Sequence, residues 1–308
     1  MGDVLIGLAP AVLAALYFFG ISALLLMLAA TAGCLVAERA FGATPGASIR
    51  DGSAALTGVL LALTLPPGLP LWMAFLGGLV AIALGKTVWG GLGHNLFNPA
   101  LVGRAFLQAA FPTAMTTWAT SSSGFFTLRA ESFAVPMMQA KADAVSAATP
   151  LAQMKFEQQA TETLSLLLGN TSGSLGETSA IAIVLGGVYL LARRTFDWRI
   201  PAAIVTGVVV FSGALYLVDS ARFAPPHFML LAGGMMFGTL FMATDPVTSP
   251  MAPRGAWIFG LGIGFFVVLI RVFGGLPEGM MYSILLMNAA TPLIERATQP
   301  KPFGRSEA

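Results

Sequence analysis

Ten apolar stretches dominate this sequence of 308 residues and constrain its fold more than any other feature. A helix needs about 20 apolar residues to cross a bilayer. The stretches run roughly over residues 3–19, 21–37, 52–65, 70–88, 95–111, 178–192, 200–218, 226–243, 255–273 and 279–297. We therefore expect an all-α polytopic membrane protein with about ten transmembrane helices.

The composition excludes the main soluble alternatives. Charged residues make up 10% of the chain, against roughly 25% in an ordinary soluble domain, so a soluble enzyme would have too little polar surface. A net charge of +2 gives no phosphate-neutralising stripe, which argues against a nucleic-acid partner.

Several of the stretches contain breaks rich in proline and asparagine. They fall at residues 65–67, 94–99, 243–250 and 288–292. Irregular backbone at membrane depth is tolerated only where it is buried in protein or lines a cavity. We expect these four breaks to mark the interior of the bundle.

The two halves of the chain resemble each other weakly. Residues 58–66 align with 238–246, each running from Gly to Pro, and residues 95–99 align with 288–292. Chance similarity between membrane segments rich in glycine and proline is the alternative. Five spans in each half would make the repeats inverted, with a binding site near the midplane at their interface.

Lysine and arginine in the short loops predict the orientation. With the N-terminus inside, ten basic residues fall on the inner side and two, Arg222 and Arg271, on the outer side. The expected organisation is a first membrane repeat (1–111), an outer loop (112–177), and a second repeat with a short cytoplasmic tail (178–308).

The chain carries few residues that could perform chemistry unaided. Cys34 is the single cysteine and His94 and His227 are the two histidines, which excludes a self-contained iron–sulfur cluster or a zinc site built on several thiolates. We assign no catalytic and no metal-ligating side chain. Any redox chemistry must come from something that the chain binds.

The outer loop contains the run Asp-Ala-Val-Ser-Ala-Ala-Thr-Pro-Leu-Ala at residues 143–152. Taken alone, this is an ordinary solvated turn of small residues. The Thr149 hydroxyl would be exposed in such a loop. Pro150 biases Thr149 toward an extended conformation.

This run resembles the flavinylation motif of the RnfD/NqrB family, the membrane subunits of two ion-pumping redox complexes, the Rnf complex and the Na⁺-translocating NADH:quinone reductase. The resemblance extends over the chain and includes residues 65–67, 90–101 and 243–250. It implies that a separate flavin transferase attaches FMN through its phosphate to Thr149, with Asp143 and Ser146 as recognition positions. Ala147 departs from the usual glycine, and the short segment before the first span favours the RnfD type.

The resemblance also implies a function. It predicts a membrane electron-transfer subunit of an Rnf-type complex, which couples electron transfer between ferredoxin and NAD⁺ to Na⁺ or H⁺ translocation. The expected partners are the other complex subunits, including a second flavin-bearing subunit at the outer face and iron–sulfur subunits, together with membrane lipid. The location would be the bacterial inner membrane, N-in and C-in, with the long loop periplasmic. Riboflavin between the repeats is a further expectation, for which the sequence shows no motif.

Other candidate residues lie at the breaks. Arg104 inside the fifth span could compensate the charge of a flavin or its phosphate, or could snorkel at a helix end. Asn95 and Asn98 could tie up free backbone groups or contact a ligand. Asp245 and Thr244 could serve ion passage or a second flavin, or could simply form a turn.

Two rival functions remain open from the sequence. Broken inverted repeats suit a solute channel or transporter equally well. A redox-silent scaffold is the third possibility. Bound flavin distinguishes the redox function from both.

Overall fold

The computed structural model describes residues 1–42, 51–118, 126, 128–136, 148–157, 159, 161–169, 171–177, 179–220 and 222–299, and the regular structure in these residues is entirely helical. Five helical segments are long and apolar enough to cross a membrane: α1 (Gly2–Phe19), α2 (Ile21–Phe41), α5 with its 3₁₀ extension (Leu71–Trp89), α11 (Arg199–Val218) and α14 (Pro253–Phe273). These findings confirm the all-helical prediction and the presence of several membrane-length helices.

The other predicted stretches also contain helices, most of them shorter. They are α4 (Ser53–Leu63), α6 (Pro99–Ala110), α10 (Ala180–Ala192), α15 (Met280–Thr298), and a broken span made of α12 (Pro226–Leu231), α13 (Met235–Phe237) and the π-helix η4 (Gly238–Met242). At 1.5 Å per residue, the 11 residues of α4 extend about 16 Å. This is about half of the roughly 30 Å hydrocarbon core.

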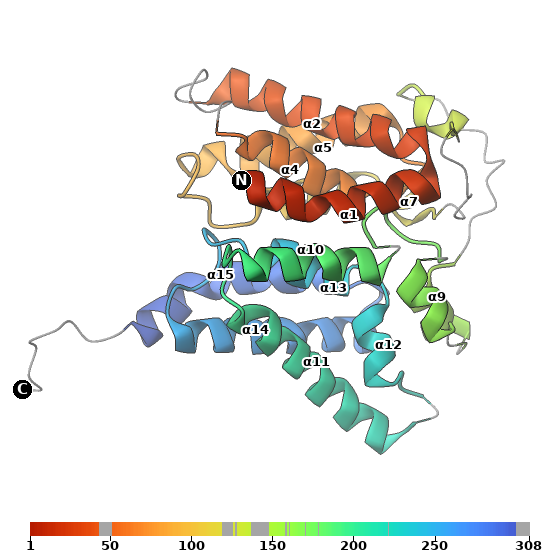
Figure 1. The fold of residues 1–308 in the computed structure, drawn as a ribbon, viewed down its shortest axis with the longest axis vertical. Helices are drawn as coiled ribbons and strands as arrows, with labels where there is room; N and C mark the ends of the chain where they lie inside the picture. The colour runs from red at the N-terminus through yellow and green to blue at the C-terminus, as the bar shows by residue number, and fades with distance from the viewer. Residues whose placement is uncertain are drawn as a thin grey trace, which may run out of the picture.

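The helices form two groups that lie against each other (Figure 1). In the first group α2 packs on α4 and α5, and α5 packs on α6. In the second group α11 packs on α14, and α14 on α15. Helices α1 and α10 pack together across the boundary between the groups.

Glycines bring the central helix pair of each group close together. A Cβ on Gly33 of α2 would overlap the carbonyl oxygen of Phe75 in α5. A Cβ on Gly260 of α14 would lie 2.8 Å from the carbonyl oxygen of Ile200 in α11. The two groups therefore use the same device, small residues facing a neighbouring backbone, as is common between membrane helices.

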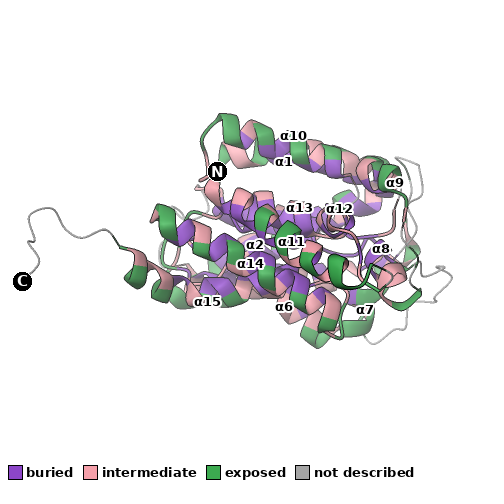
Figure 2. Cartoon of the chain, turned by 90° about the horizontal axis from the view of Figure 1, so that it is seen from below, coloured by how far each residue is buried: buried purple, intermediate pink, exposed green. Residues whose placement is uncertain are grey.

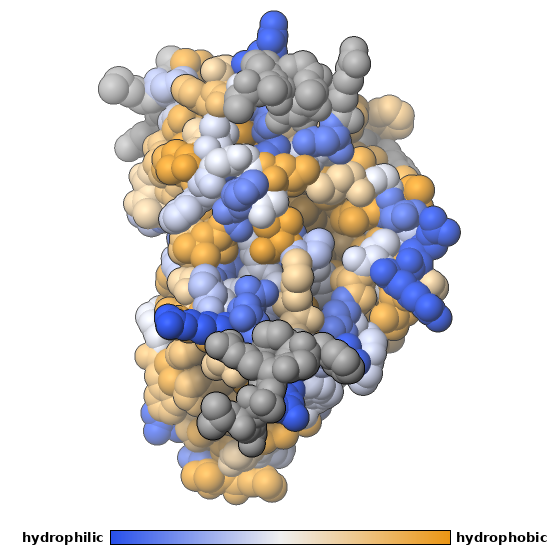
Figure 3. All heavy atoms as spheres, turned by 90° about the vertical axis from the view of Figure 1, so that its left-hand side faces the viewer, coloured by the Kyte–Doolittle hydropathy of each residue, from blue (hydrophilic) through white to orange (hydrophobic). Residues whose placement is uncertain are grey.

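The molecule has two distinct ends. Helix α1 begins and α15 ends at one of them, which we call the terminal end, and Figure 3 looks onto it and shows hydrophilic side chains gathering there. The opposite end, the loop end, carries α7 (Pro112–Thr116) and α9 (Thr163–Leu168) (Figure 1). Buried residues line the inner sides of the helices and exposed ones their outer sides (Figure 2).

Three of the four predicted breaks separate helices in the structure, at residues 64–70, 90–98 and 243–252. The fourth prediction is wrong, because α15 continues through residues 288–292 with Pro292 inside it. A proline removes one backbone donor, and the Thr291 hydroxyl bonds the carbonyl oxygens of Met287 and Thr248, both at 3.0 Å. A break that the sequence analysis missed separates α12 from α13 at residues 232–234, where Gly233 has φ 66°.

Candidate functional site

Thr149 lies at the loop end and caps a short helix, α8 (Pro150–Ala152). Its backbone is extended, with φ −69° and ψ 155°, as the following proline predicts. Its hydroxyl oxygen accepts a hydrogen bond from the Ala152 amide at 3.2 Å. The expectation of an exposed hydroxyl is wrong, because this capping position leaves Thr149 only 4% exposed.

Asp143 and Ser146, the other two positions of the motif, lie outside the described residues.

The segment that carries Thr149 is fixed to the second half of the chain at two points. Leu151 packs on Gly233, where a Cβ would lie 2.5 Å from the leucine Cδ1. The Lys155 ammonium, in the π-helix η3 (Gln153–Glu157), donates to the carbonyl oxygens of Arg271 at 2.9 Å and Gly274 at 2.5 Å. A cation is favourable at these terminal carbonyls of α14.

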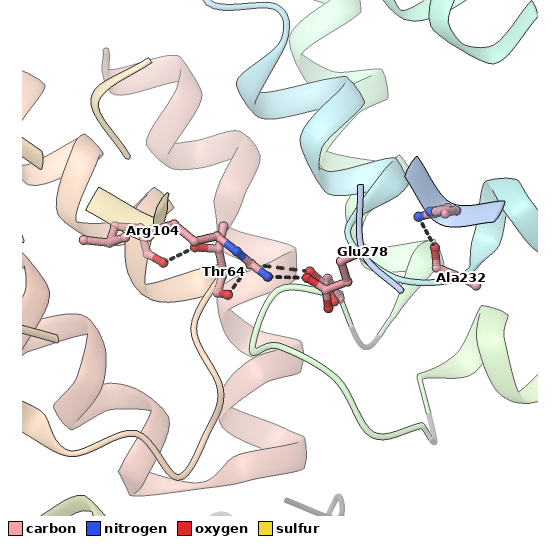
Figure 4. A network of polar contacts seen from close by, with 7 residues as sticks. Thr64, Arg104, Ala232 and Glu278 are labelled. Atoms are coloured by element: carbon pink, nitrogen blue, oxygen red, sulfur yellow. Dashed lines mark hydrogen bonds and ion pairs between the residues drawn. The ribbon is translucent and has the colours of Figure 1, made fainter. Parts of the chain in front are cut away.

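Arg104 of α6 is buried and joins several parts of the chain (Figure 4). Its guanidinium donates to the carbonyl oxygen of Thr64, in the break after α4, and to the carboxylate of Glu278, which precedes α15. A second carboxylate, that of Glu177, lies 3.8 Å away. Arg104 is therefore paired and buried, and the alternative of a snorkelling helix-end arginine is wrong.

Arg271 repeats this arrangement in the second half. The sequence analysis counted it as a loop residue, but it lies buried in the last turn of α14. Its Nη1 and Nη2 donate to the carbonyl oxygens of Met229 at 2.5 Å and Ala232 at 2.9 Å, at the break after α12 (Figure 4). The prediction failed because charge counting cannot tell a loop arginine from one that turns inward.

The sequence analysis did not single out Glu177 and Glu278. Burial, and next the neighbouring Glu278 carboxylate, raise the pKa of Glu177 above its ordinary value. The sequence did contain a signal for them. Each is an acid at the edge of a predicted apolar stretch, and Arg104, inside another stretch, needed a partner of opposite charge. We call Thr64, Arg104, Glu177, Arg271 and Glu278 the loop-end junction.

Two small cavities adjoin this junction. One, of about 30 Å³, is lined by all five junction residues. The other, of about 10 Å³, lies beside Thr149 and is also lined by Glu177 and Glu278. The motif threonine and the buried charges therefore share one region of the molecule.

Asn95 and Asn98 lie elsewhere, nearer the terminal end. The Asn98 side chain accepts from the amides of Ala100 and Leu101 at the start of α6, and its Nδ2 donates to the carbonyl oxygen of Met242 at 3.2 Å. The Asn95 Nδ2 donates to the Phe97 carbonyl oxygen at 3.3 Å. Both asparagines bond free backbone groups at the breaks.

Thr244 and Asp245 lie beside these asparagines. The Thr244 hydroxyl donates to the Leu240 carbonyl oxygen at 2.8 Å, and the Asp245 carboxylate accepts from the Val247 amide at 3.2 Å. Both line a cavity of about 310 Å³ together with Asn95 and Asn98. We call this the terminal-end cavity.

A buried ion pair that the sequence analysis missed borders the same cavity. The Lys86 ammonium donates to the Glu38 carboxylate and to the Ser53 hydroxyl, each at 2.8 Å. Lys86 and Ser53 line the cavity. The described candidates thus divide between two places, Thr149 and Arg104 at the loop end and the other four around the terminal-end cavity.

Comparison with known proteins gives one consistent result. Residues 1–304 match the NQR2, RnfD, RnfE family. The chain is 41% identical over 317 residues to the D subunit of the proton-translocating ferredoxin:NAD(+) oxidoreductase complex of Clostridium ljungdahlii, covering 99% of this chain and 91% of that one.

Two further relatives carry similar names. The D subunit of the ion-translocating oxidoreductase complex of Stutzerimonas stutzeri is 40% identical, over 99% of this chain and 92% of its own. The D subunit of the Na(+)-translocating ferredoxin:NAD(+) oxidoreductase complex of Acetobacterium woodii is 39% identical, over 99% and 90%. The chain belongs to the NQR2, RnfD, RnfE family.

Proposed function

We propose that this chain is the membrane electron-transfer subunit of an Rnf-type ion-translocating complex, with FMN joined through its phosphate to Thr149. The observation that carries the proposal is the position of Thr149. The motif threonine lies on a segment docked against the membrane helices, beside a junction that holds two buried arginines. The names of the relatives support the same assignment.

The residues around Thr149 fit such a group in their chemistry. Arg104 and Arg271 provide buried positive charge suited to a phosphate or an electron-rich ring. The space beside Thr149, about 10 Å³, is room for about one water molecule, so attachment requires this segment to open. When bound, FMN supplies the redox chemistry.

The chain itself contributes position and charge. Pro150 holds Thr149 extended, while Leu151 and Lys155 fix the segment to α12 and α14. Arg104 and Arg271 hold the broken backbone on which that segment rests. These contacts would keep a tethered group at a constant distance from the bundle.

The proposal includes a place and partners. We expect the bacterial inner membrane, with both termini inside and residues 112–177 in the periplasm. A flavin transferase would attach the FMN, and electrons would pass to or from a second flavin-bearing subunit at that face. Iron–sulfur and nucleotide sites would belong to other subunits. Na⁺ and H⁺ both remain candidate coupling ions, since the relatives are named for either.

We further propose two inverted five-helix repeats, 1–111 and 178–308, around the outer segment. The matched packing of α2 on α5 and of α11 on α14 supports this proposal. So do Thr64 and Thr244, which align in the two halves. Each hydroxyl bonds back into its own helix end, to Leu61 at 2.6 Å and Leu240 at 2.8 Å.

The terminal-end cavity is our candidate for riboflavin and for ion passage. Its volume of about 310 Å³ is at the lower edge of the usual range for small-molecule sites. Apolar walls with a few convergent polar groups also suit a flavin. Asp245 is the carboxylate that we would test first for ion passage.

The experiment measures electron transfer from reduced ferredoxin to NAD⁺ by the purified complex. We expect Thr149→Ala to abolish this turnover while the complex stays assembled. Thr163→Ala, an exposed threonine of the same outer segment, is the matched control and should retain it. Full turnover by Thr149→Ala would overturn the relay and favour a channel or a scaffold.

A further inference from the structure

A separate cavity of about 300 Å³ lies at the loop end, between the segment after Thr149 and the connection from α11 to α12. The argument uses six of its lining residues: Lys155, Phe156, Arg222, Phe223, Met229 and Arg271. Helices α11 and α12 pack on each other, and Leu151 of α8 lines the cavity together with Met229 of α12. Thr149 does not line this cavity, but Arg271 and Lys155 do, so the experiment below includes a variant that separates a lipid from the proposed flavin.

The charges around the cavity are of one sign. Lys155, Arg222 and Arg271 line it, and no acidic residue is among its described lining residues. Glu177 and Glu278 line the cavities of the loop-end junction instead. A ligand here would therefore carry negative charge.

The three basic side chains differ in how many of their hydrogen-bond donors are already used. The Lys155 ammonium bonds the last carbonyl oxygens of α14. Arg271 is 4% exposed, and its Nε has no hydrogen-bond partner among the described residues. Arg222 is exposed, with its guanidinium 5.6 Å from the ring centroid of Phe223. Both arginines therefore have hydrogen-bond donors left for an anion, the exposed Arg222 at the cavity mouth and the buried Arg271 deeper inside.

Apolar surface adjoins these charges. Phe156 is 68% exposed, and Leu217 and Val218 at the end of α11 are 87% and 81% exposed. Exposed Phe and Leu side chains beside basic residues are typical of helices that lie at the membrane–water interface. Basic pockets between membrane helices bind anionic lipid headgroups.

We propose that this cavity binds the headgroup of an anionic phospholipid from the leaflet at the loop end. The phosphate would lie between Arg222 and Arg271, and the acyl chains would run along the exposed end of α11. Neither a zwitterionic lipid nor free phosphate satisfies both features, since the first lacks net charge and the second lacks the apolar chain.

The test uses the delipidated complex, titrated with short-chain phosphatidylglycerol, phosphatidylcholine or inorganic phosphate. Thermal stability and native mass spectrometry report binding. Phosphatidylglycerol should raise the Tm and stay bound to this chain, while the other two should not. Arg222→Gln should weaken phosphatidylglycerol binding about fivefold, because one basic residue near the surface is lost. Arg254→Gln, an exposed arginine at the start of α14, is the control and should bind like wild type.

Four outcomes would overturn the proposal. Equal stabilisation by phosphatidylcholine would mean a general lipid effect. Equal binding of inorganic phosphate would mean an anion site without lipid. Unchanged phosphatidylglycerol binding by Arg222→Gln would mean that the lipid does not bind in this cavity. Thr149→Ala separates the flavin: we expect its lipid binding to be unchanged, and lipid that binds only in this variant would assign the cavity to the flavin ring.

Discussion

The loop-end junction and the terminal-end cavity solve the same structural problem in different ways. At both places helices end inside the bundle and leave backbone carbonyl groups to be satisfied. At the junction, Arg104 and Arg271 bond the carbonyl oxygens of Thr64, Met229 and Ala232. At the cavity, amide and hydroxyl groups do so, with Asn98 bonding the carbonyl oxygen of Met242.

The difference lies in the space that remains. The junction encloses about 30 Å³ and the terminal-end cavity about 310 Å³. A buried guanidinium occupies the space between the helix ends that it joins, and it needs a carboxylate beside it. A neutral capping amide satisfies the backbone groups without a charged partner and leaves space for a ligand. The comparison suggests that the junction fixes the two halves and that the cavity admits a ligand.

The largest expected effect is that of Arg104→Gln. It removes the cation beside the buried Glu177 carboxylate and the donor to the Thr64 carbonyl oxygen. Removing one partner of a buried ion pair typically costs about 3–5 kcal/mol. We expect a large fall in the Tm of the purified chain. Arg296→Gln, at the exposed arginine that follows the aligned motif in the second half, should change little. An equal fall in Tm for Arg104→Gln and Arg296→Gln would contradict the view that the junction fixes the two halves.

Overfilling the junction should have the next largest effect. A Cβ on Gly176 would lie 2.9 Å from the Leu63 carbonyl oxygen, so Gly176→Ala should cost about 1–3 kcal/mol. Leu240→Phe, which adds volume beside the terminal-end cavity, is the matched variant. It should unfold at the wild-type denaturant concentration, and a matching loss there would show that the cavity has no spare room.

Removing the capping amide should cost less than removing the arginine. Asn98→Ala deletes the cap of α6 and the bond to Met242, a loss of about 1–2 kcal/mol. Chemical unfolding of Asn98→Ala and Arg104→Gln side by side measures the contrast directly. A cost for Asn98→Ala as large as that for Arg104→Gln would mean that the terminal-end cavity is as rigid as the junction.

The last expected effect is a dependence of stability on pH. Because the pKa of Glu177 is raised in the folded chain, the folded state holds this proton more tightly than the unfolded state does. Stability should therefore fall as the pH rises from 4.5, the ordinary pKa of this carboxyl group, through about 7, its raised pKa in the folded chain. Glu177→Gln should make the Tm less dependent on pH between 4.5 and about 7. An unchanged slope would show that Glu177 is not the group that titrates.

The sequence predicted the helices well and the buried charges poorly. Apolar stretches located the five membrane-length helices of the described residues because hydropathy accumulates over many residues, and residues 65–67 marked a true break. Pro292 did not, since proline is tolerated inside a membrane helix where neighbouring helices and Ser or Thr side chains satisfy the freed backbone groups. Glu278 and Arg271 were missed because their roles depend on partners far away in the chain.

At the candidate site, too, local features were predictable from the sequence and contacts between distant residues were not. The motif at residues 143–152 identified Thr149 as a position, but not that Thr149 is buried and caps α8 by accepting from the Ala152 amide. The local conformation before Pro150 was predictable from one neighbouring residue. Its position beside Glu177 and Glu278 was not, because residues 28 and 129 positions later in the chain create it.

The most direct test of the covalent relay is the intact mass of this chain purified from its own host, beside that of Thr149→Ala. Our account predicts that the wild-type chain is heavier than its sequence mass by one FMN less one water, and that the variant lacks this excess. An unmodified wild-type mass, from cells that flavinylate other proteins, would contradict it.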